Sequence, residues 1–599
     1  MEEVRFNVPN SDDPSLAVWT FRMWFLGLIS VVLLSFLNTF FGYRSQPLVV
    51  SMISVQVATL PLGKFMAKVL PTIKFRINGF GDRHLSLNPG PFNIKEHVLI
   101  SIFANAGSAF GNGTAYAIEQ VLGYGWAGML RKYVVDPGHM WWPSSVVQVS
   151  LFSPENGSGM SGLTLDWSAV ASFLGSPLVT PFFAIANVTL DLFNSQGHFY
   201  NVSAIVNHNL QIDLQEYEKQ GRANLSVFFA ITYGIGFAPI VATLSHVALF
   251  NGREIYEQIK ATRTGKEDIH TRMMKKYKDI PNCWYQVLLV ASFVLALALC
   301  IFMKDQVQLP WWGLIFAAAL ALIFTLPISI INYGHHQSGL NIITEYVMGV
   351  ISPGKPIANV CFKTYGYMSM TQAVSFLNDF KLGHYMKIPP RSMFLTLGTI
   401  IAGTTNIAVA WWLLDTVENI CNPKLLPRNS PWTCPNDELL FDASVIWGLI
   451  GPKRIFGTLG NYGALNWLFL VGALGPLIVW LLQRAFPAHK WISYIHFPVL
   501  LGSTASMPPA TTVNFNSWII VGIIFNYFIR KYHNNWWKRY NYILSAALDA
   551  GLAFMGVLIY LSLTTHNITL HWWGASCDHC DLATCPTAKG ILVDGCPLH

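Results

Sequence analysis

Long apolar runs separated by short polar segments dominate this chain of 599 residues. The runs are continuous and do not alternate apolar with polar residues as barrel strands would. A helix that crosses a bilayer needs about 20 mostly apolar residues. The sequence therefore predicts an all-α fold, a polytopic transmembrane helical bundle. The candidate spans, by residue number, are 23–41, 48–69, 97–118, 167–190, 225–250, 284–303, 311–331, 341–362, 392–414, 465–482, 495–507, 518–530 and 542–563.

Several of these runs are short or are interrupted by glycine and proline. Inside the hydrocarbon layer, a helix is interrupted only where the freed backbone groups face protein or a wet cavity. We therefore expect broken or re-entrant helices around a central route. Residues 1–22 are expected to form a cytosolic N-terminal tail, residues 23–563 the transmembrane domain, and residues 564–599 a cysteine-containing C-terminal tail.

The composition also indicates a lipid environment, because 52% of the residues are hydrophobic and 12% are charged. A soluble domain has about 25% charged residues. The net charge of +7 comes from short basic clusters between apolar runs, without any nucleic-acid motif, so no nucleic-acid partner is expected. The first run follows acidic residues and lacks a small-residue cleavage site, which predicts an anchored span and not a secretory signal.

The distribution of basic residues predicts the orientation of the chain. Eight lysine and arginine residues lie between residues 251 and 283, which predicts a cytosolic basic loop there. One span separates this loop from the polar segment 194–224, so that segment is predicted to be an external loop. It contains a glycosylation sequon that begins at Asn201 and ends at Ser203.

Two short motifs carry a resemblance to a known family. Residues 86–97 read SLNPGPFNIKEH and residues 387–391 read KIPPR, and these strings match the NPG and KIPPR signatures of the oligopeptide transporter (OPT) family in the expected order. The agreement extends to NIITEY (341–346), ANVCFK (358–363), WGLIGPKRIFG (447–457) and NYILSAALDAG (541–551). The chain resembles the plant peptide-transporter clade of that family over nearly its whole length.

The resemblance implies a proton-coupled secondary active transporter that imports small oligopeptides, such as tetrapeptides, pentapeptides and glutathione-like peptides, at the plasma membrane. Its partners would be peptides, protons and the bilayer, and the proton gradient would drive it without a bound cofactor, catalytic residues or a metal site. Transport of metal–peptide or metal–nicotianamine chelates is the second interpretation, and a non-transporting membrane peptide receptor is the third. The family is expected to have about sixteen spans against about thirteen counted here. We therefore expect that this chain lacks spans of the family near residues 118–121, 152–153 and 188–191.

The NPG motif contains the residue types that unwind a helix end. Pro89 removes a backbone donor, Gly90 permits unusual dihedral angles, Asn88 supplies an amide, and Asn93 can cap the helix that follows. Unwound ends offer N–H and C=O groups to a zwitterionic peptide, so the resemblance favours substrate binding by these four residues. The alternative is a rigid turn at the membrane interface.

In the KIPPR motif, Lys387 and Arg391 flank a helix-breaking pair of prolines. Both are candidates to bind a substrate carboxylate, with Arg391 the better bidentate partner. Alternatively, both are positive-inside residues at the cytosolic end of a span, and the residues alone slightly favour this second interpretation.

Ionisable residues in apolar surroundings are candidates for proton coupling, because burying a charge is costly. Glu345 is the clearest of them, and Asp379 and His384 follow. For Glu345, proton coupling and a structural pairing with Lys363 are equally supported. The further ionisable residues, for which packing, capping or cross-linking roles compete with a functional one, are His246, Asp166 and Asp549.

Two groups stand out among the nine cysteines. Cys577, Cys580 and Cys585 contain one CxxC spacing without a second, which favours a structural tail over a metal site. Cys421 and Cys434 bracket a Pro-rich loop and are a candidate disulfide if that loop is external.

Overall fold

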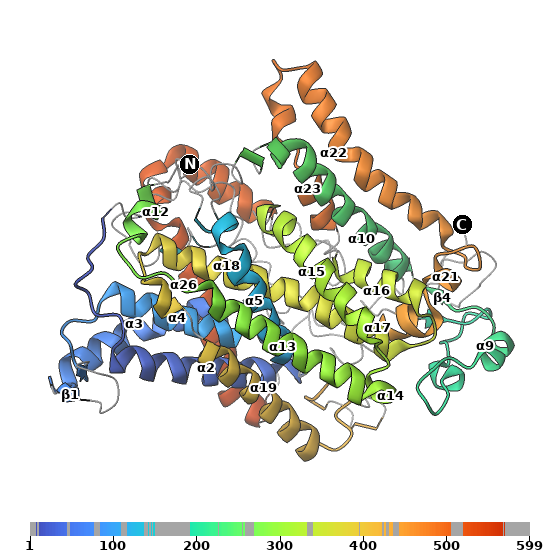
Figure 1. Ribbon diagram of the computed structural model, residues 1–599, viewed down its shortest axis with the longest axis horizontal. Helices are drawn as coiled ribbons and strands as arrows, with labels where there is room; N and C mark the ends of the chain where they lie inside the picture. The colour runs from blue at the N-terminus through green and yellow to red at the C-terminus, as the bar shows by residue number, and fades with distance from the viewer. Residues whose placement is uncertain are drawn as a thin grey trace.

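The computed structural model is a bundle of membrane-length helices (Figure 1). It describes residues 11–44, 48–72, 74–76, 84–108, 117–136, 192–225, 227–253, 269–331, 340–393, 396–421, 430–434, 443–504 and 519–566, together with 8, 142, 145, 148–149, 256–257, 425–426 and 568. Within these residues, seven helices are long and apolar enough to cross a membrane. The all-α, polytopic membrane fold is therefore confirmed. The predicted span 167–190, Asp166 and the cysteines of the tail lie outside the described residues.

Most of the helices coincide with predicted spans. They are α2 (Phe21–Gly42), α3 (Met52–Val69), α4 (Ile94–Ser108), α10 (Val227–His246), α13 (Asn282–Phe302), α15 (Trp311–Ile331), α19 (Thr396–Thr416), α22 (Trp467–Ala485), α23 (Phe497–Thr504) and α26 (Asn534–Ser562). The outward side chains of α13, such as Val287, Val290 and Val294, are apolar and exposed. Such a surface suits lipid and not water.

The short elements lie between the long helices. They include β1 (Lys74–Arg76), β2 (His84–Ser86), β3 (Leu192–Phe193), β4 (Asn224–Leu225), α9 (Leu214–Gln220), α12 (Ile269–Met274), α14 (Lys304–Val307), α21 (Pro452–Ile455) and α25 (Arg530–Tyr532). Antiparallel β1 and β2 pair Phe75 with Leu85, and antiparallel β3 and β4 pair Leu192 with Leu225. The second pair closes the segment predicted to be external.

The single span predicted over 341–362 is wrong. Two shorter helices, α16 (Leu340–Ile351) and α17 (Pro356–Lys363), replace it. Gly354 turns the chain between them at a φ of 82°, which glycine readily adopts, and Pro356 suits the first turn of α17. α17 continues through a π-helical segment, η4 (Thr364–Met368), into α18 (Ser369–Tyr385). The structure thus contains a broken helix, and its place beside a central route stays a prediction.

The predicted spans omit two helices of the bundle, α5 (Ala117–Val134) and α18. Both carry charged residues that lower their hydropathy, yet α5 packs against α18 and α13. A β-carbon at Gly123 would lie 2.6 Å from the carbonyl oxygen of Ser369, and one at Gly128 would clash with the ring of Tyr285. Small residues permit this close approach of membrane helices.

The two ends of the bundle differ in charge. α10 connects the polar segment 194–224 to the basic segment 251–283. α13 returns from the basic segment to the polar one. Its far end lies at the polar segment, because Gln308, beyond that end, donates a hydrogen bond to the carbonyl of Asn209 (2.9 Å). In Figure 1, α9 and α14 lie at the right, and α12 and β1 lie at the left. The predicted external and cytosolic segments are therefore at opposite ends. Cys421 and Cys434, beyond α19, form the expected disulfide.

Candidate functional site

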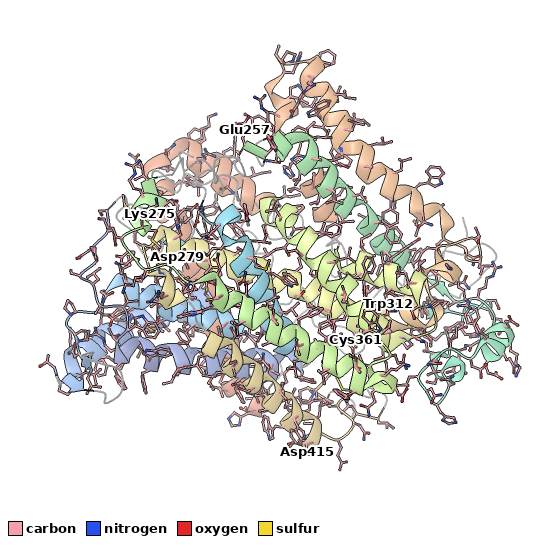
Figure 2. The ribbon with its side chains drawn as sticks, viewed as in Figure 1. Glu257, Lys275, Asp279, Trp312, Cys361 and Asp415 are labelled. Atoms are coloured by element: carbon pink, nitrogen blue, oxygen red, sulfur yellow. A yellow bond between two sulfur atoms is a disulfide. The ribbon has the colours of Figure 1, made fainter. Side chains whose placement is uncertain are left out.

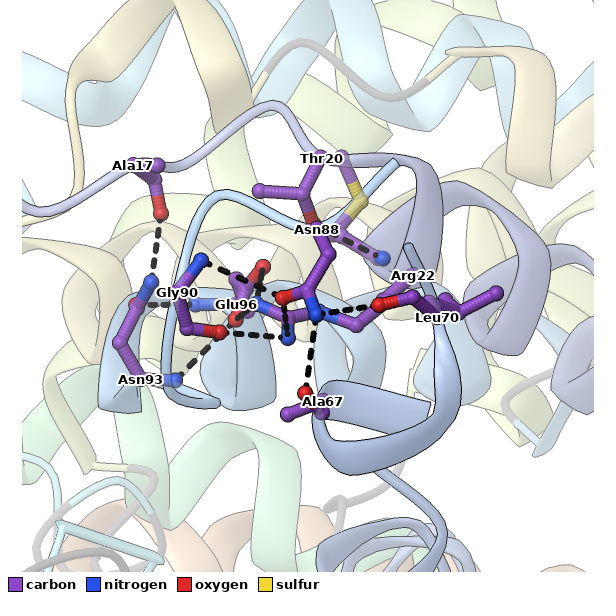
Figure 3. A network of polar contacts seen from close by, with 10 residues as sticks. Ala17, Thr20, Arg22, Ala67, Leu70, Asn88, Gly90, Asn93 and Glu96 are labelled. Carbon is purple, nitrogen blue, oxygen red and sulfur yellow. Dashed lines mark hydrogen bonds and ion pairs between the residues drawn. The ribbon is translucent and has the colours of Figure 1, made fainter. Parts of the chain in front are cut away.

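The NPG motif forms a turn whose polar groups are engaged within the protein (Figure 3). The side-chain amide of Asn88 donates to the carbonyls of Ala67 (2.9 Å) and Leu70 (2.7 Å) at the end of α3. Its oxygen accepts from Arg22 (3.1 Å) and from the backbone N–H of Gly90 (3.3 Å). Asn88 thereby ties α2, α3 and the turn together.

Asn93 caps α4, as the sequence suggested. Its Oδ1 accepts from the backbone N–H of Glu96 (3.0 Å), and Oε2 of Glu96 accepts from the backbone N–H of Asn93 (3.1 Å), which is a capping box. The guanidinium of Arg22 binds both oxygens of Glu96 at 3.0 Å and the carbonyl of Gly90 at 2.8 Å. Both side chains of this ion pair are 0% exposed. Peptide binding by Asn88, Pro89, Gly90 and Asn93 stays a prediction.

The expected N-terminal tail overlaps α2, which begins at Phe21, and its preceding residues pack against other segments. Lys95 at the start of α4 binds Asp12 (3.0 Å) and the hydroxyl of Tyr277 (2.9 Å), which itself donates to Asp12 (2.7 Å). Burial and the Asp12 carboxylate raise the pKa of Tyr277, so it remains a protonated donor. The indole of Trp19 donates to the hydroxyl of Ser392 (2.5 Å).

The KIPPR motif ends α18 and turns the chain. Lys387 has a φ of 55°, and the backbone N–H of Ile388 bonds to the carbonyl of Gly383 (2.9 Å), which is the Schellman arrangement at a helix C-terminus. The buried ammonium of Lys387 bonds to the carbonyl of Tyr385 and to a ring nitrogen of His270, both at 2.9 Å. These contacts hold a backbone conformation that is rare for lysine.

A cavity of about 310 Å³ lies beside this turn. Its walls come from the end of α5, from α12 and the residues after it, from the end of α18 and from the KIPPR turn. The lining residues are Arg131, Val135, Asp136, Thr271, Met274, Lys275, Tyr277, Asp279, Phe380, Gly383, His384, Ile388, Pro390 and Met393. The predicted proton-coupling residue His384 thus faces the cavity, and the KIPPR motif forms part of its rim.

Charged groups surround the cavity. Arg131 pairs with Asp279 (2.5 Å), whose backbone carbonyl accepts from the exposed side chain of Arg391 (3.1 Å). Figure 2 shows Lys275 and Asp279 at the same end of the bundle. Burial raises the pKa of Asp136, and the nearby cations partly oppose this shift. Such a site suits a zwitterion, because it offers cations and carboxylates within one cavity.

Two predicted proton-coupling carboxyls lie inside the bundle in different surroundings. Glu345 on α16 is buried and binds Lys363 on α17 at 2.7 Å, so the structural pairing considered for it is present. Asp379 on α18 is 5% exposed and accepts a hydrogen bond from Asn105 on α4 (2.8 Å).

His246 stacks on Phe250, as expected of a packing residue. The surroundings of the Asp549 side chain lie outside the described structure.

Four residues of the site were not predicted from the sequence, namely Arg22, Glu96, Asn105 and Arg131. Arg22 stands at the start of an apolar run and Glu96 within the NPG string, so both positions were visible as charges at a membrane boundary. Their pairing joins residues 74 positions apart and has no periodic signal.

These features define the class of the protein, which is a multi-pass helical membrane protein with buried ion pairs and a polar cavity. The model of the family described as OPT oligopeptide transporter protein matches residues 18–156 and 146–563. The chain belongs to this family of membrane transporters, and it is not an enzyme.

Three relatives from Arabidopsis thaliana show how far the similarity extends. Oligopeptide transporter 2 is 58% identical over 100% of this chain and 97% of its own length. Oligopeptide transporter 4 is 56% identical over 100% and 98%, and Oligopeptide transporter 7 is 46% identical over 100% and 93%.

The alignments also show an internal difference in length. The alignment with Oligopeptide transporter 2 extends over 715 positions, 116 more than the 599 residues of this chain. The two family matches meet at residues 146–156, close to 152–153, where one missing span was expected. That relative therefore contains residues that have no counterpart within this chain.

Proposed function

We propose that this chain is a proton-coupled secondary active transporter that imports small oligopeptides, including tetrapeptides, pentapeptides and glutathione-like peptides, across the plasma membrane. Family membership and the names of the relatives support peptides as the cargo. The mixed charges around the cavity support a zwitterionic ligand.

One buried carboxyl group differs from the others, and this contrast carries the proposal of proton coupling. Glu96 and Glu345 each form an ion pair with a buried cation. Asp379 instead receives a hydrogen bond from the neutral amide of Asn105 and, among the residues that the structure describes, forms no ion pair. A buried charge without a counterion is costly. Proton uptake and release are therefore the natural response of Asp379 to a change in its surroundings.

The position of Asp379 links it to the cavity. Asp379 and Gly383 are four residues apart on α18, so they share one face of the helix at a separation of about 6 Å along its axis. Gly383 and His384 line the cavity. The cavity thus offers a short route by which protons reach Asp379, with His384 in the cavity wall as the relay.

The cavity also provides groups for the peptide itself. Arg131 and Lys275 lie in its wall and suit the peptide carboxylate, while Asp136 suits the ammonium group. Lys387 and Arg391 lie next to it and add to the positive field. Its volume falls at the lower end of the range of roughly 300–1,000 Å³ for small-molecule sites, so it accommodates one end of a peptide.

The test compares Asp379→Asn with the wild type in proteoliposomes. Asparagine keeps the shape and the acceptor for Asn105 but does not titrate. We expect labelled tetrapeptide to exchange across the membrane in both proteins, while an inward proton gradient accelerates uptake by the wild type alone. The control is Asp415→Asn, an exposed carboxylate at the end of α19, which should retain the acceleration.

Uptake by Asp379→Asn that still responds fully to the gradient would remove Asp379 from the coupling role. The same vesicles, supplied with glutathione or with iron and copper chelates, separate peptide transport from chelate transport. Binding of peptide without any exchange would instead support a receptor.

A further inference from the structure

Two glycosylation sequons begin within the segment predicted to be external. One begins at Asn201 and ends at Ser203, and the second begins at Asn224 and ends at residue 226. We propose that Asn201 carries an N-linked glycan and that Asn224 does not.

The arrangement of the helices supports a non-cytosolic location for both sequons. α13 and α19 start close to each other, because Arg391, shortly before α19, bonds to the backbone of Asp279, shortly before α13. α13 leads to the contact with the polar segment, and α19 leads to the disulfide between Cys421 and Cys434. Disulfides persist in oxidising compartments. The segment 194–224 therefore shares its side of the membrane with an oxidised cysteine pair, opposite the basic segment.

Asn201 is open to modification. Asn201 and Ser203 are both exposed. Asn201 precedes the 3₁₀ helix η2 (Val202–Ile205), and its side chain forms no cap hydrogen bond with that helix. A glycan on this side chain would extend into solvent without displacing a neighbouring element of the described structure.

Asn224 is the opposite case. It is 2% exposed and lies in β4, three residues before α10. Its Nδ2 donates to the carbonyls of Asn194 and Arg222, both at 3.3 Å, and its Oδ1 accepts from Asn461 (2.9 Å). A glycan on Nδ2 would replace one of its two hydrogens and so remove one of the two donated bonds. In this buried position the sugar would also separate β4 from the residues around Asn461. A chain modified there cannot form this packing.

The chemistry is the standard transfer of an oligosaccharide to an asparagine. The Nδ2 atom of Asn201 forms a bond with the anomeric carbon of an oligosaccharide carried on a polyprenyl pyrophosphate. The bond from that carbon to the pyrophosphate oxygen breaks, the pyrophosphate leaves with the electron pair, and the amide loses one proton. The hydroxyl of Ser203 completes the sequon that the transferase recognises.

The experiment uses the full chain, translated into microsomal membranes and treated with an endoglycosidase that removes high-mannose glycans. We expect the wild type to lose one glycan step of electrophoretic mobility on treatment. Asn201→Gln and Ser203→Ala should each lack that step before treatment. The conservative variant Ser203→Thr should keep it, which excludes a general effect of changing the loop.

Asn224→Gln is the matched control, and it should retain the step seen in the wild type. A wild type that is insensitive to the endoglycosidase would overturn the proposal. A step that persists unchanged in Asn201→Gln but disappears in Asn224→Gln would overturn it as well. Neither readout requires transport, so the result is independent of the proposed function.

Discussion

Replacing Arg22 with methionine removes the cation on which α2, the NPG turn and the start of α4 converge. Arg22 donates two hydrogen bonds to Glu96, one to Asn88 and one to Gly90, from a fully buried position. Arg22→Met leaves the Glu96 carboxylate buried without a counterion. Removing one partner of a buried ion pair costs about 3–5 kcal/mol of unfolding free energy, and we expect a loss in this range.

A double variant shows whether this cost comes from an unpaired charge. Glu96→Leu alone leaves the guanidinium without its counterion and should also cost about 3–5 kcal/mol. In Arg22→Met combined with Glu96→Leu, neither charge remains, and only the hydrogen bonds to Asn88, Gly90 and Asn93 are lost. We therefore expect the double variant to be more stable than the sum of the single effects predicts, by about 3 kcal/mol.

The assay is equilibrium unfolding in mixed micelles, followed by tryptophan fluorescence as the mole fraction of dodecyl sulfate rises. The control is Arg253→Met, which breaks a pair with Glu257 whose side chains are 90% and 61% exposed. It should cost at most about 0.5 kcal/mol. Strictly additive single effects, or a loss for Arg22→Met no larger than that of the control, would refute the reasoning.

Two further predictions concern the interior of the bundle. Glu345→Gln should destabilise the protein by about 3 kcal/mol, because Lys363 loses its buried counterion. The pH profile of uptake per folded molecule should stay that of the wild type. A profile that becomes flat would assign the coupling role to Glu345. Gly128→Leu should destabilise the folded protein by about 3 kcal/mol, because the new side chain meets the ring of Tyr285. The readout is a smaller monodisperse fraction in size-exclusion chromatography. Gly551→Ala, where a β-carbon meets nothing within 4 Å, is its control, and equal losses in both would contradict the packing argument.

Apolar length alone predicted the helices that face lipid. The run 23–41 became α2 (Phe21–Gly42), and the run 284–303 became α13 (Asn282–Phe302). α5 and α18 escaped prediction because they lie inside the bundle, where charged residues find partners and glycines replace bulky side chains. A hydropathy criterion measures suitability for lipid, and these two helices largely contact protein.

The candidate site was predictable only where its partners are close in sequence. The pairing of Glu345 with Lys363 was considered because both lie in short neighbouring motifs. The cap at Asn93 followed from residue type and position. The pair of Arg22 and Glu96 depends on how α2 packs against α4, which no local pattern specifies.

α17, η4 and α18 form one uninterrupted helix from Pro356 to Tyr385, about 45 Å long. Lys363 and Asp379 therefore belong to a single rod, and rotation about its axis carries both through the same angle. The π-helical turn at Thr364–Met368 lies between them. Because one residue of a helix corresponds to roughly 100° of rotation, the hydrogen-bond register of this turn fixes the relative azimuth of the two halves. The register of that turn thus sets the direction in which the Asp379 carboxyl points for a given position of the Lys363 ammonium.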